Sequence, residues 1–198
     1  DDCYKFRKNK EPACESPDRP CKWMSGKCKL PGTKFYHAVY GHISEWDTSL
    51  VSSMAYLFLQ LNYDEDEQII PFNQDIGNWD TSSVINMDGM FKNSRYFNSP
   101  IGKWDTSNVL SMDEMFYKVK FNQDISGWSV SNVKSMDGMF EQSDFNKNIG
   151  MWDVGKVEFM RKMFKGAHFF NNQNNPSIID WDLTNLKYCH EMFMSLGF

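Results

Sequence analysis

Two groups of residues in this chain have side chains whose type and spacing could do chemistry. The first is a set of aspartates, each directly after a regularly spaced tryptophan: Asp47, Asp80, Asp105, Asp153 and Asp182. Stacked in a row, these carboxylates would offer oxygen ligands for divalent cations, or a carboxylate pair for hydrolysis. The alternative role is structural, because an aspartate before Thr-Ser can accept hydrogen bonds from the first amides of a helix. We favour helix capping, since Ser129 interrupts the row.

The second group is the cysteines, four of which crowd the first thirty residues: Cys3, Cys14, Cys21 and Cys28. Their spacing contains no C-x-x-C zinc pattern. We therefore predict two disulfides, with a structural zinc site as the alternative and the pairing left open. Disulfides imply an oxidising compartment, and hence a secreted or cell-surface protein. The isolated Cys189 is expected to be a buried free thiol that acts as a small hydrophobe.

The rest of the sequence contains no recognisable catalytic arrangement. The four histidines share no metal-ligand spacing, and neither a nucleophile elbow nor a phosphate-binding loop occurs. We expect no enzymatic activity and no cofactor. The net charge of −5 argues against nucleic acid and anionic membranes as partners. No apolar run approaches the ~20 residues that span a bilayer. The start at Asp1, without a methionine, is interpreted as a chain whose leader has been removed.

Six copies of one apolar grid organise the chain. Each copy has an isoleucine three residues before its tryptophan, a valine or leucine five after, a methionine or cysteine eight after, and a phenylalanine twelve after. The predicted core comprises Trp46, Trp79, Trp104, Trp128, Trp152, Trp181, Met87, Met112, Met136, Met160, Phe91, Phe116, Phe140 and Phe164. A grid that recurs at a nearly fixed period predicts an array of stacked units, each too small to fold alone.

Each copy has two halves that predict different local structures. Val84, Met87, Met90 and Phe91 lie at offsets 0, 3, 6 and 7, which is typical of one face of a helix. The other half, such as residues 75–80, is short and contains glycine, which favours a strand of two to four residues or an extended turn that pairs in parallel with its neighbours. Helices are ~10 Å wide, whereas strands lie ~4.8 Å apart, so such an array should curve with its strands inside.

The sequence thus predicts an α/β fold in two parts. Residues 1–34 would form a small disulfide-rich N-terminal cap, and residues 35–198 a curved right-handed solenoid of about six helix-plus-short-strand repeats. The asparagines that follow the phenylalanine at the start of a repeat should hydrogen-bond the next coil and form a ladder: Asn73, Asn98, Asn122, Asn146 and Asn171.

The block FNQDIGNWDTSSVINMDGMF, residues 72–91, closely resembles the BspA-like, DUF285 surface-protein repeat of about 25 residues. The pattern M-x-x-M-F-x-x-A-x-x-F-N-Q-x-I-x-x-W-D-x-S-x-V is matched from Met87 to Val109 and again from Met112, Met136 and Met160. The resemblance covers about residues 40–195. It implies a plan similar to leucine-rich repeats, and a secreted or surface-displayed protein that binds other proteins or matrix and has no catalytic residues.

Two functional hypotheses follow. In the first, a curved solenoid face is a binding or adhesion module for a protein or a surface or matrix glycan. Its candidate contacts are the outward positions before each tryptophan, which vary while the core does not: Glu45, Asn78, Lys103, Gly127, Met151 and Asp180. In the second, the chain is a structural subunit that self-assembles through its C-terminal coil, which lacks a polar closing cap.

Overall fold

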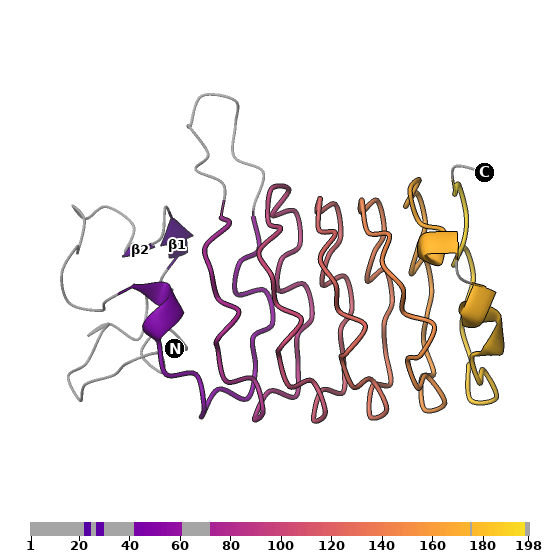
Figure 1. The fold of residues 1–198 in the computed structure, drawn as a ribbon, viewed down its shortest axis with the longest axis horizontal. Helices are drawn as coiled ribbons and strands as arrows, with labels where there is room; N and C mark the ends of the chain where they lie inside the picture. Colours follow the sequence, from indigo (N-terminus) through magenta and orange to yellow (C-terminus); the bar gives the residue numbers. More distant parts are fainter. Residues whose placement is uncertain (1–21, 25–26, 30–41, 61–71, 175, 197–198) are drawn as a thin grey trace.

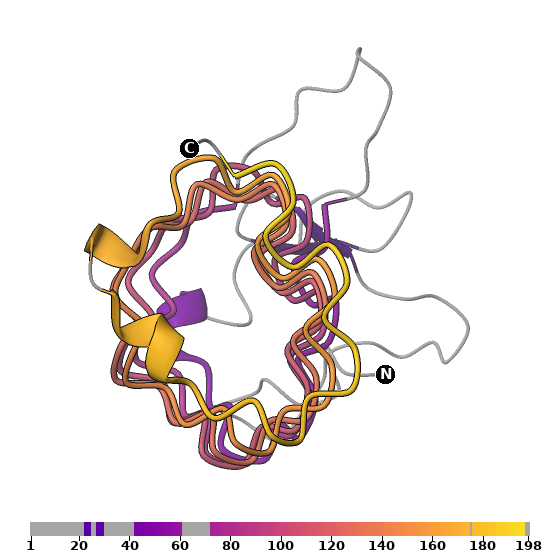
Figure 2. The ribbon, with the colours of Figure 1, turned by 90° about the vertical axis from the view of Figure 1, so that its right-hand side faces the viewer.

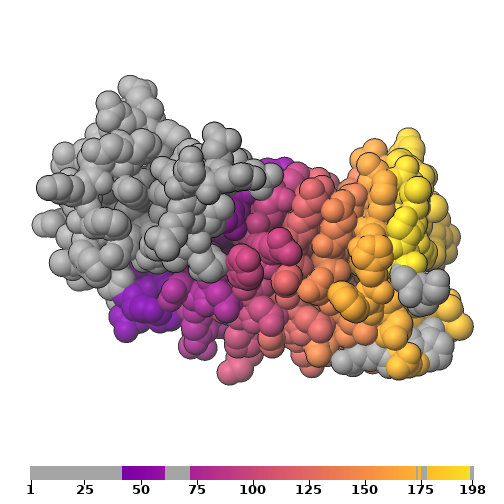
Figure 3. Space-filling view, turned by 90° about the horizontal axis from the view of Figure 1, so that it is seen from above, coloured from indigo at the N-terminus to yellow at the C-terminus, as the bar shows by residue number. Residues whose placement is uncertain are grey.

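The computed structural model describes residues 22–24, 27–29, 42–60, 72–174 and 176–196. The described residues between 42 and 196 wind into coils that lie side by side in a row (Figure 1) and overlie one another when viewed along the row (Figure 2). The space-filling view shows them as adjoining bands of one surface (Figure 3). We number the coils 1 to 6 by their tryptophans: Trp46, Trp79, Trp104, Trp128, Trp152 and Trp181.

Regular secondary structure is sparse in the described residues. Strands β1 (Lys22–Met24) and β2 (Lys27–Lys29) pair antiparallel at the N-terminal end. Three short 3₁₀ helices belong to the coils: η2 (Ile43–Glu45) in coil 1, and η3 (Asn172–Asn174) and η4 (Pro176–Asp180) on the way into coil 6. The predicted α/β solenoid of helix-plus-strand repeats is therefore wrong, because the described coils contain neither an α-helix nor a strand longer than an isolated bridge.

Successive turns occupy the half of each coil that was predicted to be helical. In coil 3, Met115 N–H donates to the Met112 carbonyl, and Tyr117 N–H to the Glu114 carbonyl, each three residues back. The amides that alternate with these two donate instead to coil 4, as Glu114 N–H does to the Asp137 carbonyl at 2.8 Å. A helix would direct every one of these amides four residues back within its own coil. Here the neighbouring coil takes half of them, so a single coil cannot satisfy its own backbone.

Left-handed residues at two fixed positions keep the helix from forming. The tenth residue after each tryptophan has a φ of 53–59°, as in Glu114 and Lys162. In coils 2 to 6 the fourteenth residue has a positive φ as well, at 58° in Lys118. A right-handed helix cannot pass through such residues, because its φ is close to −60° throughout.

Parallel pairing does occur, but on the other side of the coil from where it was predicted. The isolated bridges join the seventh residue after each tryptophan in the sequence Ser53, Asn86, Ser111, Ser135, Phe159 and Tyr188. Residues 76–79 form a turn instead. The expected curvature depended on wide helices facing narrow strands, and that reason is absent here.

The predicted disulfide-rich cap is not seen. Cys3, Cys14 and Cys21 lie outside the described residues, and so does the side chain of Cys28, whose backbone is part of β2. Cys189 is a free thiol, as predicted, but its predicted burial is wrong, because the residue is exposed. It belongs to coil 6, on whose outer side the described part of the chain places no further coil.

The interior is one continuous column of aromatic and aliphatic side chains. The tryptophans of coils 2 to 5 are buried, and each indole Nε1 donates to the isoleucine carbonyl of the preceding coil at 2.8–3.3 Å. Trp46 is partly buried. The buried Nε1 of Trp181 has no hydrogen-bond partner among the described residues. Phenylalanine rings stack from coil to coil, as Phe116 does on Phe140 with centroids 5.6 Å apart.

Side-chain ladders fasten the coils together around this column. The predicted asparagine ladder is confirmed, because the Oδ1 atoms of the first four asparagines each accept the N–H of their counterpart in the next coil at 2.8–3.0 Å. A threonine ladder lies deeper, where Thr81 and Thr106 are buried and donate to backbone carbonyls of the next coil at 2.9 Å. Val130 replaces threonine in coil 4 and is buried as well. The threonine row is therefore part of the interior.

Candidate binding face

The candidate contact residues lie on one row of turns, which we call the turn ridge. In every coil the tryptophan N–H donates to the carbonyl of the isoleucine three residues earlier, which closes a tight turn. The turn ridge consists of the two central residues of these turns: residues 44–45, 77–78, 102–103, 126–127, 150–151 and 179–180. All the predicted contact residues, Glu45, Asn78, Lys103, Gly127, Met151 and Asp180, are exposed at these turns.

The turns of the ridge sit very close to one another, and glycine makes this possible. A Cβ atom built on Gly102 would lie 2.4 Å from the carbonyl oxygen of Asp124 in the next coil, and one on Gly77 would lie 2.5 Å from that of Pro100. Real Cβ atoms do not approach backbone oxygens so closely, so a side chain would force the turns apart. In coils 2 and 3, the glycine in the first position of the turn thus lets the turn pack directly against the next coil.

Two large apolar side chains are almost fully exposed on the ridge. Met151 is 85% exposed in coil 5, and Ile179 is 81% exposed in coil 6. Single exposed apolar residues are common on soluble proteins, but neighbouring ones on a rigid support are typical of contact sites. Covering such side chains with a partner is favourable, because it removes apolar surface from water.

The aspartates that follow the tryptophans flank the ridge and are also exposed. Asp47 Oδ1 accepts hydrogen bonds from the backbone N–H of Ser49 at 3.1 Å and from its hydroxyl at 2.7 Å. These bonds stabilise the charged form and lower the pKa of Asp47, with the hydroxyl bond contributing most. The pKa of Asp105 is lowered in the same way by Ser107. The predicted capping of a helix is wrong because no helix follows, but the carboxylates do cap a turn.

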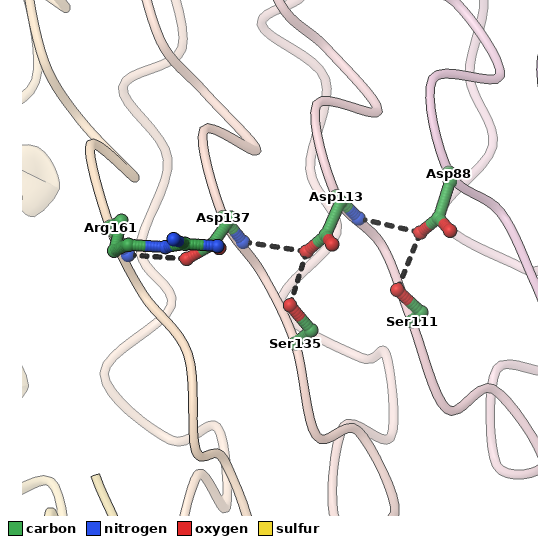
Figure 4. Close-up of polar contacts among 6 residues, drawn as sticks. All are labelled: Asp88, Ser111, Asp113, Ser135, Asp137 and Arg161. Carbon is green, nitrogen blue, oxygen red and sulfur yellow. Dashed lines mark hydrogen bonds and ion pairs between the residues drawn. The ribbon is translucent and has the colours of Figure 1, made fainter. Parts of the chain in front are cut away.

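A second aspartate row, which the sequence analysis missed, lies on another side of the coils. Asp88, Asp113 and Asp137 are half-buried in coils 2 to 4 and stand in line (Figure 4). Asp88 Oδ1 accepts the Asp113 N–H at 2.9 Å, and Asp113 Oδ1 accepts the Asp137 N–H at 2.8 Å. The signal was present as an aspartate that directly follows a core methionine in three consecutive copies. We call these three residues the aspartate ladder.

No arrangement for metal binding is found in the described part of the chain, where histidine, cysteine, aspartate and glutamate side chains form no group of three that could hold an ion. The acidic run Asp64–Glu67 lies outside the described residues. Within the described ranges, no helical segment has the length and hydrophobicity needed to cross a bilayer.

These features define a class of protein: a stack of turn-built coils that presents one row of varied, exposed side chains on a uniform interior. The chain belongs to the family described as "Mycoplasma protein of unknown function, DUF285", whose model matches residues 33–120 and 101–197. The resemblance to the DUF285 repeat is thereby confirmed. Searches among curated proteins and among solved structures found no match to the chain.

Proposed function

We propose that this protein is a non-enzymatic, extracellular or cell-surface module that binds another protein, or a matrix component, through the turn ridge. The observation that carries this proposal is a contrast between the turn, which is constant from coil to coil, and the exposed residue at its end, which we call the tip residue. The turn and its tryptophan are the same in each coil, whereas the exposed tip residue changes from acidic to amide, basic and apolar along the row. A surface that varies on a constant frame is what selective recognition requires.

Met151 and Ile179 are the proposed anchors of this contact. Each presents most of its side chain to solvent, and together they occupy neighbouring coils at one end of the ridge. Covering a large apolar side chain is worth ~1.5–3 kcal/mol. Two such anchors would supply a substantial part of a micromolar affinity, which corresponds to about −8 kcal/mol.

Electrostatics favours a partner whose contacting surface is basic. Exposed carboxylates line both sides of the ridge, with Asp75 and Asp124 before the turns and Asp80, Asp105 and Asp153 after them. Lys103 is the basic tip residue of the ridge. Association should therefore weaken as salt rises from 0.05 to 0.5 M, since the Debye length falls from more than ~10 Å to a few ångströms.

The test is a binding screen of the purified protein against extracellular-matrix proteins and a glycan array, followed by variants measured on each hit. Met151→Ser and Ile179→Ser should each weaken binding by about tenfold or more, which corresponds to ~1.4 kcal/mol. The matched control is Leu50→Ser, because Leu50 is 86% exposed and lies on a different turn. Equal losses for the control and the ridge variants would refute the ridge as the contact.

A structural subunit is the second candidate, and the exposed apolar side chains of coil 6 favour it. Leu183, Phe193 and Met194 are all exposed there. Light scattering over a hundredfold range of protein concentration separates the two proposals. A monomer at every concentration would contradict assembly, whereas growing particles that bind no probe in the screen would contradict the binding module.

A further inference from the structure

The aspartate ladder places three carboxylates on adjacent coils with little to neutralise them. Asp113, in the middle, is half-buried between Asp88 of coil 2 and Asp137 of coil 4 (Figure 4). Its Oδ1 accepts both the Asp137 N–H, at 2.8 Å, and the Ser135 hydroxyl, at 2.5 Å. The carboxylate is thus a bracket between coils 3 and 4, and its own N–H is held by Asp88 in the same way.

The charged groups around Asp113 are arranged unequally. Arg161 of coil 5 pairs with Asp137 through Nε at 2.7 Å and Nη2 at 2.5 Å, so the only guanidinium of this row serves the end of the ladder. Glu114, next in the chain, pairs with Lys92. Among the described residues, no cation forms an ion pair with Asp113.

Burial and like charge therefore act together on the middle carboxyl. Burial raises the pKa of Asp113 most, and the neighbouring carboxylates Asp88 and Asp137 raise it further. The hydrogen bonds from Ser135 and Asp137 oppose this, but the pKa stays above the ordinary aspartate value. The folded stack holds a proton at this position more tightly than an unfolded chain does.

We propose that Asp113 is a proton-binding joint whose own contribution to the cohesion of coils 2 to 4 is larger in acidic than in neutral surroundings. The proton comes from solvent and binds the Oδ2 oxygen, which leaves the two bonds accepted by Oδ1 in place. Proton linkage gives the direction in which stability changes with pH. A carboxyl whose pKa is raised by folding contributes stability that is fully present below the pKa of the unfolded chain, about 3.9, and is lost as pH rises through the pKa of the folded chain.

The asparagine ladder of the same molecule shows that a neutral side chain can accept the same hydrogen bond between coils. Asn98 Oδ1 accepts the Asn122 N–H at 2.8 Å, which matches the Asp113 bond to Asp137 N–H in length. An amide at position 113 can keep this acceptor without the charge. Asp113→Asn therefore isolates the cost of the carboxylate from its role as a bracket.

The experiment compares thermal unfolding of the whole chain as wild type, Asp113→Asn and Asp105→Asn from pH 4 to 8. Asp113→Asn should raise the Tm at pH 8, and this gain should shrink towards pH 4. Asp105→Asn is the matched control, because Asp105 is an exposed carboxylate of the same coil whose pKa is lowered; it should not raise the Tm at pH 8. A gain for Asp113→Asn that is absent or independent of pH would overturn the proposal.

A second measurement does not depend on how the variants fold. Carbon-13 NMR of the wild-type chain, with aspartate carboxyls assigned by through-bond connectivity, gives the titration midpoint of Asp113 directly. A midpoint above the ordinary aspartate value supports the joint. A midpoint at or below that value refutes it, whatever the unfolding data show.

Discussion

Removing the indole of Trp104 should cost this protein a large part of its stability. Trp104 is 3% exposed, and its ring stacks on Trp128 at 6.3 Å and on Phe91 at 6.2 Å, so it contacts the coils on both sides. Deleting a buried ring of this size costs about 3–5 kcal/mol, because transfer energy is lost and a cavity remains. The lost indole N–H bond adds little, since the Ile76 carbonyl still accepts the Trp79 N–H at 3.1 Å.

Urea unfolding followed by circular dichroism is a suitable assay for Trp104→Ala. With a slope of about 2 kcal/mol/M, a loss of ~4 kcal/mol lowers the midpoint by ~2 M. Lys103→Ala is the matched control, because Lys103 is adjacent and exposed, and it should change stability by no more than ~0.5 kcal/mol. If Trp104→Ala fell within 1 kcal/mol of wild type, the argument that the coils share one interior would be refuted.

Three further predictions concern the ladders and the turns. Thr106→Val should lower the free energy of unfolding by only ~1 kcal/mol in a urea experiment, because it removes one hydrogen bond and keeps the side-chain shape that Val130 has in coil 4. A loss above ~3 kcal/mol would contradict this. Gly102→Ala should destabilise by ~1–3 kcal/mol through its clash with the next coil, whereas Gly127→Ala, whose nearest atom is 4.0 Å away, should be nearly neutral. Equal effects at the two glycines would argue against close stacking of the turns. The lowered pKa of Asp105 contributes stability that is present above about pH 4 and lost as pH falls through its folded value, so Asp105→Asn should flatten the acid limb of a Tm–pH curve.

The sequence was sufficient to place the interior and one of its ladders. The isoleucine, tryptophan, valine and methionine positions are fixed by chemistry that does not depend on local geometry, because a buried apolar side chain must recur once per coil in any stacked array. The asparagine ladder was predictable for the same reason. Asn122 needs only a coil above it to supply an N–H group.

Local backbone structure could not be predicted in the same way. The offsets of Val84, Met87 and Met90 fit a helix, but a spacing of three also separates Ile76 from Trp79, outside the predicted helix. A helix that begins near Val84 does not explain that spacing, whereas a coil built of three-residue turns does. The competing evidence for a helix came from residues 80–82, whose side chains cap a turn equally well.

The aspartate ladder was harder to predict, since its meaning depends on register. Asp88 lies directly after a buried methionine, where a helix would have placed it on the solvent side. Only the turn-built coil brings it under Asp113 of the next coil. A polar residue between two core positions is ambiguous until the backbone that joins them is known.

Around residues 86–93, the hydrogen bonds that join backbone groups of neighbouring coils run one way. The amides of residues 87, 89, 91 and 93 all donate to coil 3, and the carbonyls of residues 86, 88, 90 and 92 all accept from coil 1. Peptide dipoles on this side therefore add along the row, with the positive end towards coil 6. During synthesis, each finished coil presents donors to the one that emerges after it. We expect the stack to fold from its N-terminal end by addition of one coil at a time, with each folded coil as the template for the next.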